Sequence, residues 1–154
     1  MPTIAVFPGS FDPITKGHEN IVKRALPLFD EIVIGIGSNS TKKHFLSLEK
    51  REEFAKKTFA GIKNIRVVVY DGLTVDFCKK VGATHILRGL RTSADFEFER
   101  AIGQMNHAMA PGIDNVFLVS DPSLSHISSS IVREILLFKG DVSIFVPDAI
   151  KESL

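Results

Sequence analysis

The sequence predicts an α/β fold: one domain built on a doubly wound sheet of five parallel strands, with helices on both faces. Short apolar runs alternate with segments whose apolar residues recur at helical spacing, which is typical of a parallel sheet with crossover helices. The chain has 154 residues, 44% of them apolar and 24% charged, which suits one globular domain. We see no repeat, low-complexity tract or linker, so residues 1–154 are treated as a single domain.

The first half of the chain supplies three strands and two helices. Residues 3–7 form a short β-branched run that ends at a proline–glycine turn, and residues 32–37 and 65–70 are similar apolar runs. Residues 47–60 begin with a serine that can cap a helix and a glutamate in the first turn. Residues 18–29 read as a helix with one apolar face, formed by Ile21, Val22, Ala25, Leu26 and Phe29.

The second half repeats this alternation. A glycine at position 82 is a suitable C-cap for the helix expected before it. The strands are expected at residues 84–87 and 115–119, and the helices at 73–81, 94–109, 128–138 and, as a short terminal turn, 147–154.

Composition excludes several classes of protein. With 19 basic and 18 acidic residues the net charge is +1, so there is no basic field for holding a nucleic acid. The single cysteine, Cys78, excludes an intrachain disulfide, and its apolar helix face predicts a core position. The longest apolar run, residues 32–37, is far below the ~20 residues that span a bilayer. The first residues do not resemble a signal peptide. We expect a cytoplasmic protein with no membrane or nucleic-acid partner.

Polar residues collect in the segments that follow the predicted strands. A Rossmann-like sheet binds its ligands beyond the carboxyl ends of its strands, where the strand order reverses. The segments at this edge are 8–18, 38–46, 71–74, 88–93 and 120–130, and four of the five are rich in glycine, hydroxyl, basic or histidine side chains. The sequence therefore predicts one functional site at this edge.

The segment after the first strand has the composition of an anion-binding turn. Glycine allows close approach of backbone to a ligand, and the N–H groups at a helix N-terminus attract anions. His18 would stand at this helix start, where the helix dipole lowers its pKa while its ring N–H can still donate to a phosphate oxygen. The segment matches neither the P-loop nor the Gly-x-Gly-x-x-Gly pattern. The pattern alone is equally compatible with an ordinary turn and a first-turn histidine.

The run from Pro8 to Pro13 (Pro-Gly-Ser-Phe-Asp-Pro), followed by Thr15-Lys16-Gly17-His18, resembles the signature of nucleotidyltransferases that carry a Thr/His-x-Gly-His motif. Within this superfamily the chain is similar to the bacterial phosphopantetheine adenylyltransferases over nearly its whole length. The other matching blocks occur in the same order, and they are Ser40-Thr41-Lys42-Lys43, Arg88-Gly89-Leu90-Arg91, residues 94–99, Ile127-Ser128-Ser129-Ser130 with Arg133, and Gly140-Asp141-Val142.

The resemblance implies reversible transfer of AMP from ATP to 4′-phosphopantetheine, which yields dephospho-coenzyme A and pyrophosphate during coenzyme A biosynthesis. Because the attacking phosphate oxygen is already anionic at pH 7, the reaction needs cationic and N–H donors rather than a general base. Mg²⁺ is expected to arrive with ATP, without metal ligands from the protein. The resemblance also implies a homohexamer and feedback inhibition by coenzyme A.

Residue roles follow from the same resemblance. Ser10, His18 and Lys42 are implied to be catalytic: Ser10 holds the attacking phosphate, His18 stabilises the transition state, and Lys42 neutralises the phosphates. The acceptor is implied to bind Ser10, Lys42, Thr74 and Arg88. ATP is implied to bind Ser10, Phe11, His18, Gly89, Leu90, Arg91, Glu99, Leu124, Ser125, His126, Ile127, Ser128, Ser129 and Ser130.

The chain departs from the family pattern at three of these positions. The family usually has aromatic residues near Leu124 and His126, and a larger apolar residue at Thr74. Adenine contacts would then use backbone atoms or aliphatic side chains, and a backbone contact at Thr74 would survive. Among the other histidines, His85 is expected to be a hydrogen-bonded core residue, whereas His44 and His107 are expected at the surface; no zinc-ligand spacing is present.

Without the resemblance, several of these residues have simpler interpretations. Lys42 would belong to a solvated basic loop, Arg88 would close a strand at the surface, Glu99 would lie on a solvated helix face, and Ser128 would cap a helix. A related transferase acting on nicotinamide mononucleotide or glycerol 3-phosphate is the enzymatic alternative. A non-catalytic flavodoxin-like signalling module is the other, but it would need a pocket of several aspartates that this sequence does not offer.

Overall fold

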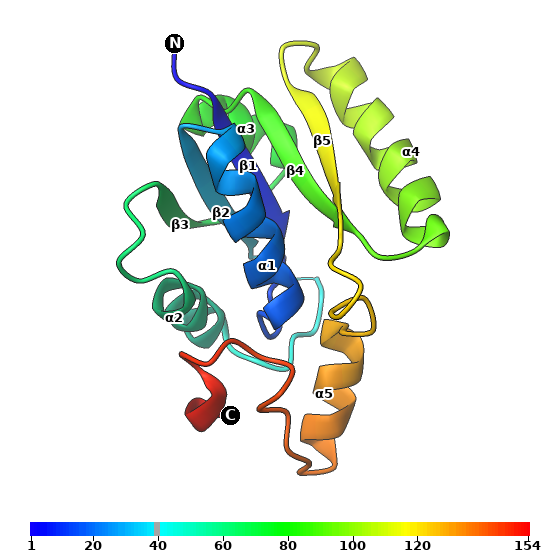
Figure 1. Cartoon of the computed structure of the whole chain (residues 1–154). Helices are drawn as coiled ribbons and strands as arrows, with labels where there is room; N and C mark the ends of the chain where they lie inside the picture. Colours follow the sequence, from blue (N-terminus) through cyan, green and yellow to red (C-terminus); the bar gives the residue numbers. More distant parts are fainter. Residues whose placement is uncertain (39–40) are drawn as a thin grey trace.

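The computed structural model describes residues 1–38 and 41–154, and its centre is one sheet of five parallel strands. The strands lie in the order β3-β2-β1-β4-β5, so the winding direction reverses between β1 and β4 (Figure 1). The predicted α/β fold with a five-stranded doubly wound sheet is confirmed. The strands are β1 (Ile4–Gly9), β2 (Glu31–Gly37), β3 (Ile65–Tyr70), β4 (His85–Leu90) and β5 (Asp114–Val119).

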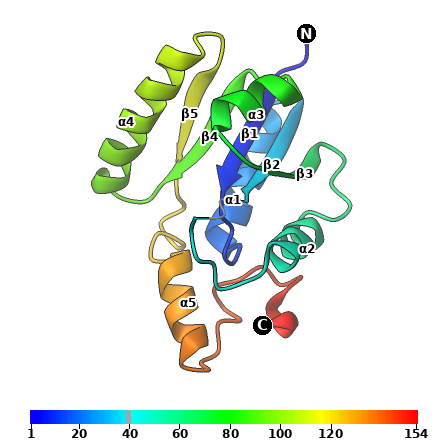
Figure 2. The same ribbon diagram turned by 180° about the vertical axis from the view of Figure 1, so that it is seen from behind.

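Helices cover both faces of the sheet. In Figure 1 α1 lies in front of the central strands, and Figure 2, seen from behind, shows α3 on the opposite face. The helix α5 lies beyond the carboxyl ends of the strands, where it closes that edge. The helices are α1 (Lys16–Ala25), α2 (Leu48–Thr58), α3 (Thr74–Val81), α4 (Ser93–Met109) and α5 (Ser129–Leu137), with short 3-10 turns η1 (Leu26–Leu28) and η2 (Lys151–Ser153).

The two faces carry separate apolar cores because side chains alternate along a strand. Ala5 and Phe7 of β1 pack with α1, α2 and α5 on one face, whereas Val6 packs with α3 on the other. Val6 is paired with Val33 of β2, and both are fully buried. The central strands are therefore buried on both faces, which explains their almost uninterrupted apolar sequences.

Several element ends differ from the sequence prediction. The strand predicted to end at Leu87 continues to Leu90, because its last residues pair with Phe117, Leu118 and Val119 of β5. Arg88 therefore projects from inside a strand. The first helix begins at Lys16, two residues before His18, and the predicted terminal helix is only the three-residue turn η2. Cys78 is buried as predicted. In residues 1–38 and 41–154 no helix is long and apolar enough to cross a membrane.

Candidate active site at the carboxyl edge of the sheet

Two adjoining cavities open at the carboxyl ends of the strands. The first cavity, of about 360 Å³, lies between the turn after β1, the start of α1 and the start of α5. The second cavity, of about 280 Å³, lies between the ends of β1 and β2 and one side of α4. Six residues line both cavities, and we call them the junction: Pro8, Gly9, Ser10, Lys42, Arg88 and Glu99.

His18 enters the first cavity as a neutral hydrogen-bond donor. Thr15 caps α1 and donates its backbone N–H to Nδ1 of His18 at 3.0 Å, so the neutral ring carries its proton on Nε2. Burial, followed by the charges of Arg88 and Arg91, lowers the pKa of His18 from 6.5 to about 4. The ring also packs edge-on against Phe11, with ring centroids 5.0 Å apart. At pH 7 this arrangement presents a fixed N–H to any oxygen in the cavity.

Lys42 and Ser10 meet at the junction. Lys42 Nζ donates to Ser10 Oγ at 3.4 Å, which places an ammonium and a hydroxyl between the two cavities. Lys42 follows β2 in the chain and Ser10 follows β1, so the adjacency of these two strands brings them together. Ser40, which belongs to the same sequence block as Lys42, lies outside the described residues.

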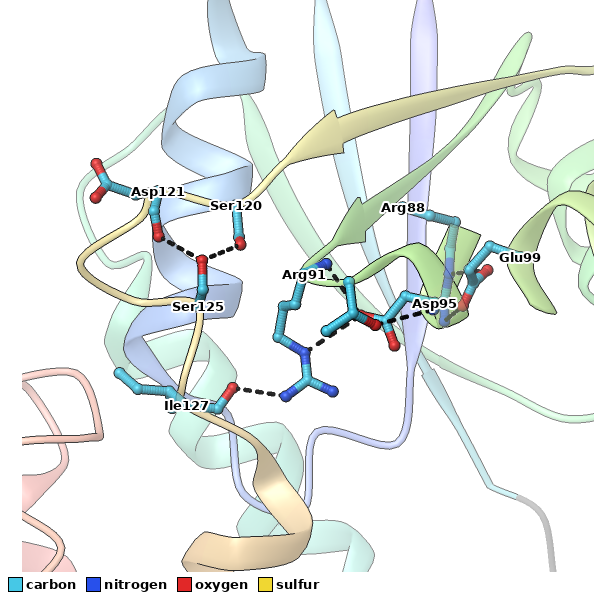
Figure 3. A network of polar contacts seen from close by, with 9 residues as sticks. Arg88, Arg91, Asp95, Glu99, Ser120, Asp121, Ser125 and Ile127 are labelled. Carbon is cyan, nitrogen blue, oxygen red and sulfur yellow. Dashed lines mark hydrogen bonds and ion pairs between the residues drawn. The ribbon is translucent and has the colours of Figure 1, made fainter. Parts of the chain in front are cut away.

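Arg88 is held at the junction by a two-pronged ion pair. Its Nε and Nη2 donate to the two carboxylate oxygens of Glu99, at 2.9 and 2.7 Å (Figure 3). Its Nη1 donates to the Pro8 carbonyl at 2.6 Å. The guanidinium has five N–H donors, so two remain for a ligand after these three contacts. Glu99 is buried, and its carboxylate fixes the direction in which Arg88 points.

The start of α5 and Arg91 form the opposite wall of the first cavity. Ser128 caps α5 by accepting the N–H of Ile131 at 3.2 Å, and Ser129 Oγ donates to the Pro13 carbonyl at 3.0 Å. Arg91 Nη1 donates to the Ile127 carbonyl at 3.1 Å (Figure 3). The first cavity thus lies between the N-termini of two helices, α1 and α5, and both ends favour an anion.

Most of the residues predicted for the site line one of these cavities. The second cavity holds Thr74, whose Oγ1 lies 2.9 Å from Tyr70 Oη. Besides the junction residues, those in the first cavity are Phe11, His18, Gly89, Arg91, Leu124, Ile127, Ser128, Ser129 and Ser130.

Three predicted nucleotide-binding residues line neither cavity in the described part of the chain. The Leu90 carbonyl accepts the N–H of Ser120 in the connection from β5, at 2.8 Å. Ser125 Oγ lies 2.9 Å from Ser120 Oγ and donates to the Asp121 carbonyl (Figure 3). His126 packs edge-on against Phe145. Leu90 and Ser125 are half-buried and His126 is exposed, so these three residues are engaged with neighbouring segments rather than with either cavity.

Other lining residues were missed by the sequence interpretation. Thr15 had a signal, because a threonine three residues before His18 is capping-box spacing. Tyr70, Asn106 and Asn115 line the second cavity but come from three different elements. Only the strand order brings them together, so sequence spacing gives no sign of them. Arg133 also lines the first cavity and donates to the Asp12 carbonyl at 2.9 Å.

The histidines outside the predicted site are His44, His85 and His107, and they differ in burial. The expectation that His44 lies at the surface is wrong: the side chain is half-buried, and its Nε2 is buried without a partner among the described residues. His107 is exposed as expected. His85 is half-buried, with Nδ1 2.8 Å from Thr84 Oγ1 and its ring tilted against Phe29.

The site supplies positive charge and N–H donors rather than metal ligands. Within residues 1–38 and 41–154, no three histidine, cysteine or carboxylate side chains are grouped to hold a metal ion. Asp12, a carboxylate that lines the first cavity, accepts backbone N–H bonds from Phe45 and Leu46 on its two oxygens. The described side chains therefore offer no cage for a resident metal.

The chain is similar to known proteins over nearly its whole length. The family model described as cytidylyltransferase-like matches residues 6–135. A phosphopantetheine adenylyltransferase from Flavobacterium psychrophilum is 53% identical over 147 residues, which covers 96% of this chain and 97% of that protein. The protein of the same name from Flavobacterium johnsoniae is 54% identical over 147 residues, covering 96% of each. That from Vesicomyosocius okutanii is 46% identical over 154 residues, covering 100% and 98%.

Solved structures share the fold at low sequence identity. A putative nicotinate-nucleotide adenylyltransferase from Vibrio parahaemolyticus superposes with a TM-score of 0.74 at 17% identity, over 97% of this chain and 92% of that one. A bifunctional NMN adenylyltransferase/ADP ribose pyrophosphatase from Francisella tularensis gives a TM-score of 0.73 at 17% identity, over 95% and 45%. These likenesses support the fold alone. From the family match and the full-length identities, the chain belongs to the cytidylyltransferase-like family and, within it, to the phosphopantetheine adenylyltransferases.

Proposed function

We propose that this chain transfers AMP from ATP to 4′-phosphopantetheine, reversibly, forming dephospho-coenzyme A and pyrophosphate in coenzyme A biosynthesis. One observation carries the assignment to this site: two cavities adjoin, and their shared wall holds Ser10, Lys42 and Arg88. Two anionic substrates bound side by side would place their reacting phosphates against this wall. Membership of the family supports the same reaction.

In this proposal ATP occupies the first cavity. The triphosphate lies between the starts of α1 and α5, where the serines at 128–130 and the helix N–H groups suit the β- and γ-phosphates. Arg91, fixed through Ile127 and Asp95, adds a guanidinium beside them. The acceptor occupies the second cavity, with its phosphate at Arg88 and Lys42 and the rest of the molecule toward Thr74.

The chemistry is a direct displacement at the α-phosphorus. A phosphate oxygen of the acceptor forms a bond to this phosphorus, and the bond to the pyrophosphate oxygen breaks, so pyrophosphate leaves with its electron pair. His18 Nε2–H donates to an α-phosphoryl oxygen, and Lys42 offsets the negative charge that accumulates. Because the nucleophile is already ionised, no residue needs to remove a proton.

Mg²⁺ enters this proposal as part of the substrate. The triphosphate itself supplies oxygen ligands for Mg²⁺, an ion that keeps several of its waters and needs few ligands from the protein. The described residues fit that role, since they form no group of three metal-ligating side chains and both Asp12 oxygens already accept N–H bonds.

Acceptor choice is tested by parallel reactions. Purified protein is incubated with MgATP and either 4′-phosphopantetheine, nicotinamide mononucleotide or glycerol 3-phosphate, and released pyrophosphate is measured. We expect release with 4′-phosphopantetheine only. Release with nicotinamide mononucleotide or glycerol 3-phosphate instead would keep the chemistry but overturn the substrate, and no release from folded protein that binds ATP would overturn the reaction.

We also propose three properties that follow from the family. The chain assembles as a homohexamer, coenzyme A inhibits it as a feedback regulator, and it works in the cytoplasm. Exposed apolar side chains on α4, on α5 and at the C-cap of α5 support self-association, because an interface would remove them from water. They include Phe98, Ile102, Met105, Met109, Leu137 and Phe138.

A further inference from the structure

We propose that Asp12 and Arg51 are positioning residues for this reaction, which hold Lys42 and Ser10 in place through backbone contacts. Asp12 lines the first cavity, but both of its carboxylate oxygens accept backbone N–H bonds. This proposal rests on the proposed AMP transfer. Both side chains are only 3% exposed, and charged side chains are rarely buried this deeply unless their contacts require it. Neither residue is implied to bind a substrate or take part in catalysis.

Asp12 holds the segment that carries Lys42, which we call the Lys42 segment (residues 41–46). Its Oδ2 accepts the N–H of Phe45 and its Oδ1 accepts the N–H of Leu46, both at 2.8 Å. Two charge-assisted bonds to consecutive backbone N–H groups fix the direction of the chain at this point. Phe45 lies only three residues after Lys42, so the Asp12 carboxylate fixes the position of the backbone from which the Lys42 side chain extends.

Arg51 holds Ser10, the residue that Lys42 contacts. From inside α2, its Nη1 donates to the Ser10 carbonyl at 2.9 Å and to the Gly37 carbonyl at 3.2 Å. The guanidinium thereby links the residue after β1 to the last residue of β2. Arg51 lines neither cavity in the described part of the chain, so it reaches the chemistry only through Ser10.

Asp12 and Arg51 both act on the contact between Lys42 and Ser10. Asp12 is two residues from Ser10 in the chain. Burial lowers the pKa of Arg51, and the charge of Asp12 opposes this effect. Arg133 adds a third link by donating to the Asp12 carbonyl from α5. Between these fixed points Lys42 Nζ reaches Ser10 Oγ at 3.4 Å. A displacement of about 1 Å at a reacting phosphate costs about a hundredfold in rate, so this anchoring bears directly on turnover.

A double-mutant cycle tests the proposal. We compare kcat at saturating MgATP and 4′-phosphopantetheine for the wild type, Asp12→Asn, Lys42→Ala and the double variant. Asp12→Asn loses an acceptor for one backbone N–H and should lower kcat by about tenfold to a hundredfold. If Asp12 acts through Lys42, the same change in the Lys42→Ala background should cost less than about twofold. Equal losses in both backgrounds would overturn the proposal.

Two further variants separate positioning from a general loss of structure. Asp30→Asn is the matched control, because Asp30 also accepts a backbone N–H, from Thr3 at 2.7 Å, but lies before β2 at the opposite edge of the sheet. It should leave kcat unchanged. Arg51→Lys keeps the buried charge, but its shorter side chain does not reach the position of Nη1, the nitrogen that donates to both carbonyls. It should lower kcat less in the Ser10→Ala background than in the wild type, because Arg51 acts through Ser10. If circular dichroism shows Asp12→Asn unfolded, this cycle of Arg51 and Ser10 takes its place, and equal losses in both backgrounds would overturn the proposal.

The cycle also distinguishes this proposal from the proposed function. If the wild type does not adenylylate 4′-phosphopantetheine, the proposed function fails. The Kd for MgATP is then measured in place of kcat for the same four proteins. A coupling between positions 12 and 42 in Kd would still support the positioning role. Additive losses in Kd would overturn it.

Discussion

At the scale of single residues, the protonation state of His18 decides how it can act. A histidine that receives a backbone N–H on Nδ1 and is surrounded by Phe7, Phe11 and two arginines stays neutral at pH 7. A neutral ring donates through Nε2 without adding a charge that would have to be desolvated. The geometry therefore favours hydrogen bonding to the transferring group over proton transfer.

The titration of His18 should show this directly. Its ring proton in the ligand-free protein should shift in the NMR spectrum with a midpoint near pH 4, well below the ordinary 6.5. Between those values the unfolded chain binds a proton at His18 that the folded chain does not. This histidine therefore contributes stability that is complete above pH 6.5 and is lost as the pH falls toward 4. A midpoint near 6.5 would contradict the buried, neutral state.

Arg88 and Glu99 give a second prediction at this scale. Arg88→Ala should mainly raise the KM for 4′-phosphopantetheine, because the guanidinium faces the second cavity with two free donors. Glu99→Gln keeps the shape of the side chain but weakens the paired hydrogen bonds to Arg88, at 2.7 and 2.9 Å. It should raise the KM for 4′-phosphopantetheine by about fivefold to tenfold, which corresponds to the usual free energy of one hydrogen bond. Steady-state kinetics with each substrate varied would check both. A rise confined to the KM for ATP would favour Glu99 as a nucleotide ligand instead.

At the scale of elements, helix ends build the site. The helices α1 and α5 both begin at the first cavity, and each has a hydroxyl N-cap, Thr15 and Ser128. The cap satisfies one backbone N–H of each first turn, and the Lys16 N–H donates to the Phe145 carbonyl. The first-turn residues left at the cavity are Gly17 of α1 and Ser129 and Ser130 of α5. The structure therefore ties the stability of a helix end to the binding of a phosphate.

A pair of cap variants separates these two effects. Ser128→Ala and Ser47→Ala remove the same kind of cap, from α5 and α2 respectively. Each should lower the free energy of unfolding by about 1 kcal/mol in urea denaturation. Only Ser128→Ala should also raise the KM for ATP, because α5 begins at the first cavity and α2 does not. Equal KM values in the two variants would contradict the role of the α5 N-terminus.

Most elements could be predicted from local sequence, and the differences have local causes. The strand β4 runs past Leu87 because β5 pairs with it, and a glycine at position 89 gives no propensity signal for that continuation. Ser128 was correctly placed at a helix start, since a serine before an apolar periodic run is a strong cap signal. The partner of Ser125 is Ser120, a contact within a turn that periodicity does not encode.

At the scale of the whole molecule, the strand order explains why the site forms where it does. The order reverses between β1 and β4, and the junction forms where the end of β1 with Ser10, Lys42 after β2, Arg88 in β4 and Glu99 in α4 meet. The edge of the sheet that carries the site could be predicted from the alternation of elements alone. The second cavity could not, because Tyr70, Asn106 and Asn115 meet only through the assembled sheet and α4.

The assembly gives a prediction at the same scale. Multi-angle light scattering should yield a mass about six times the 17.0 kDa of one chain, because the apolar faces of α4 and α5 would then be covered. Phe98 and Met105 are each 67% exposed in the single chain. Changing both to glutamate should lower the mass, since burying two charges in an apolar contact is costly. A wild-type mass of 17 kDa would contradict the hexamer.

The most direct test follows the α-phosphorus itself. ATP labelled at this position with ³²P is incubated with Mg²⁺, 4′-phosphopantetheine and the wild-type protein, and the products are separated. The label should appear in dephospho-coenzyme A, with one pyrophosphate released per labelled product, and His18→Ala should slow this by roughly 10²–10³. Label found in free AMP, or a His18→Ala rate close to that of the wild type, would contradict direct transfer at the junction of the two cavities.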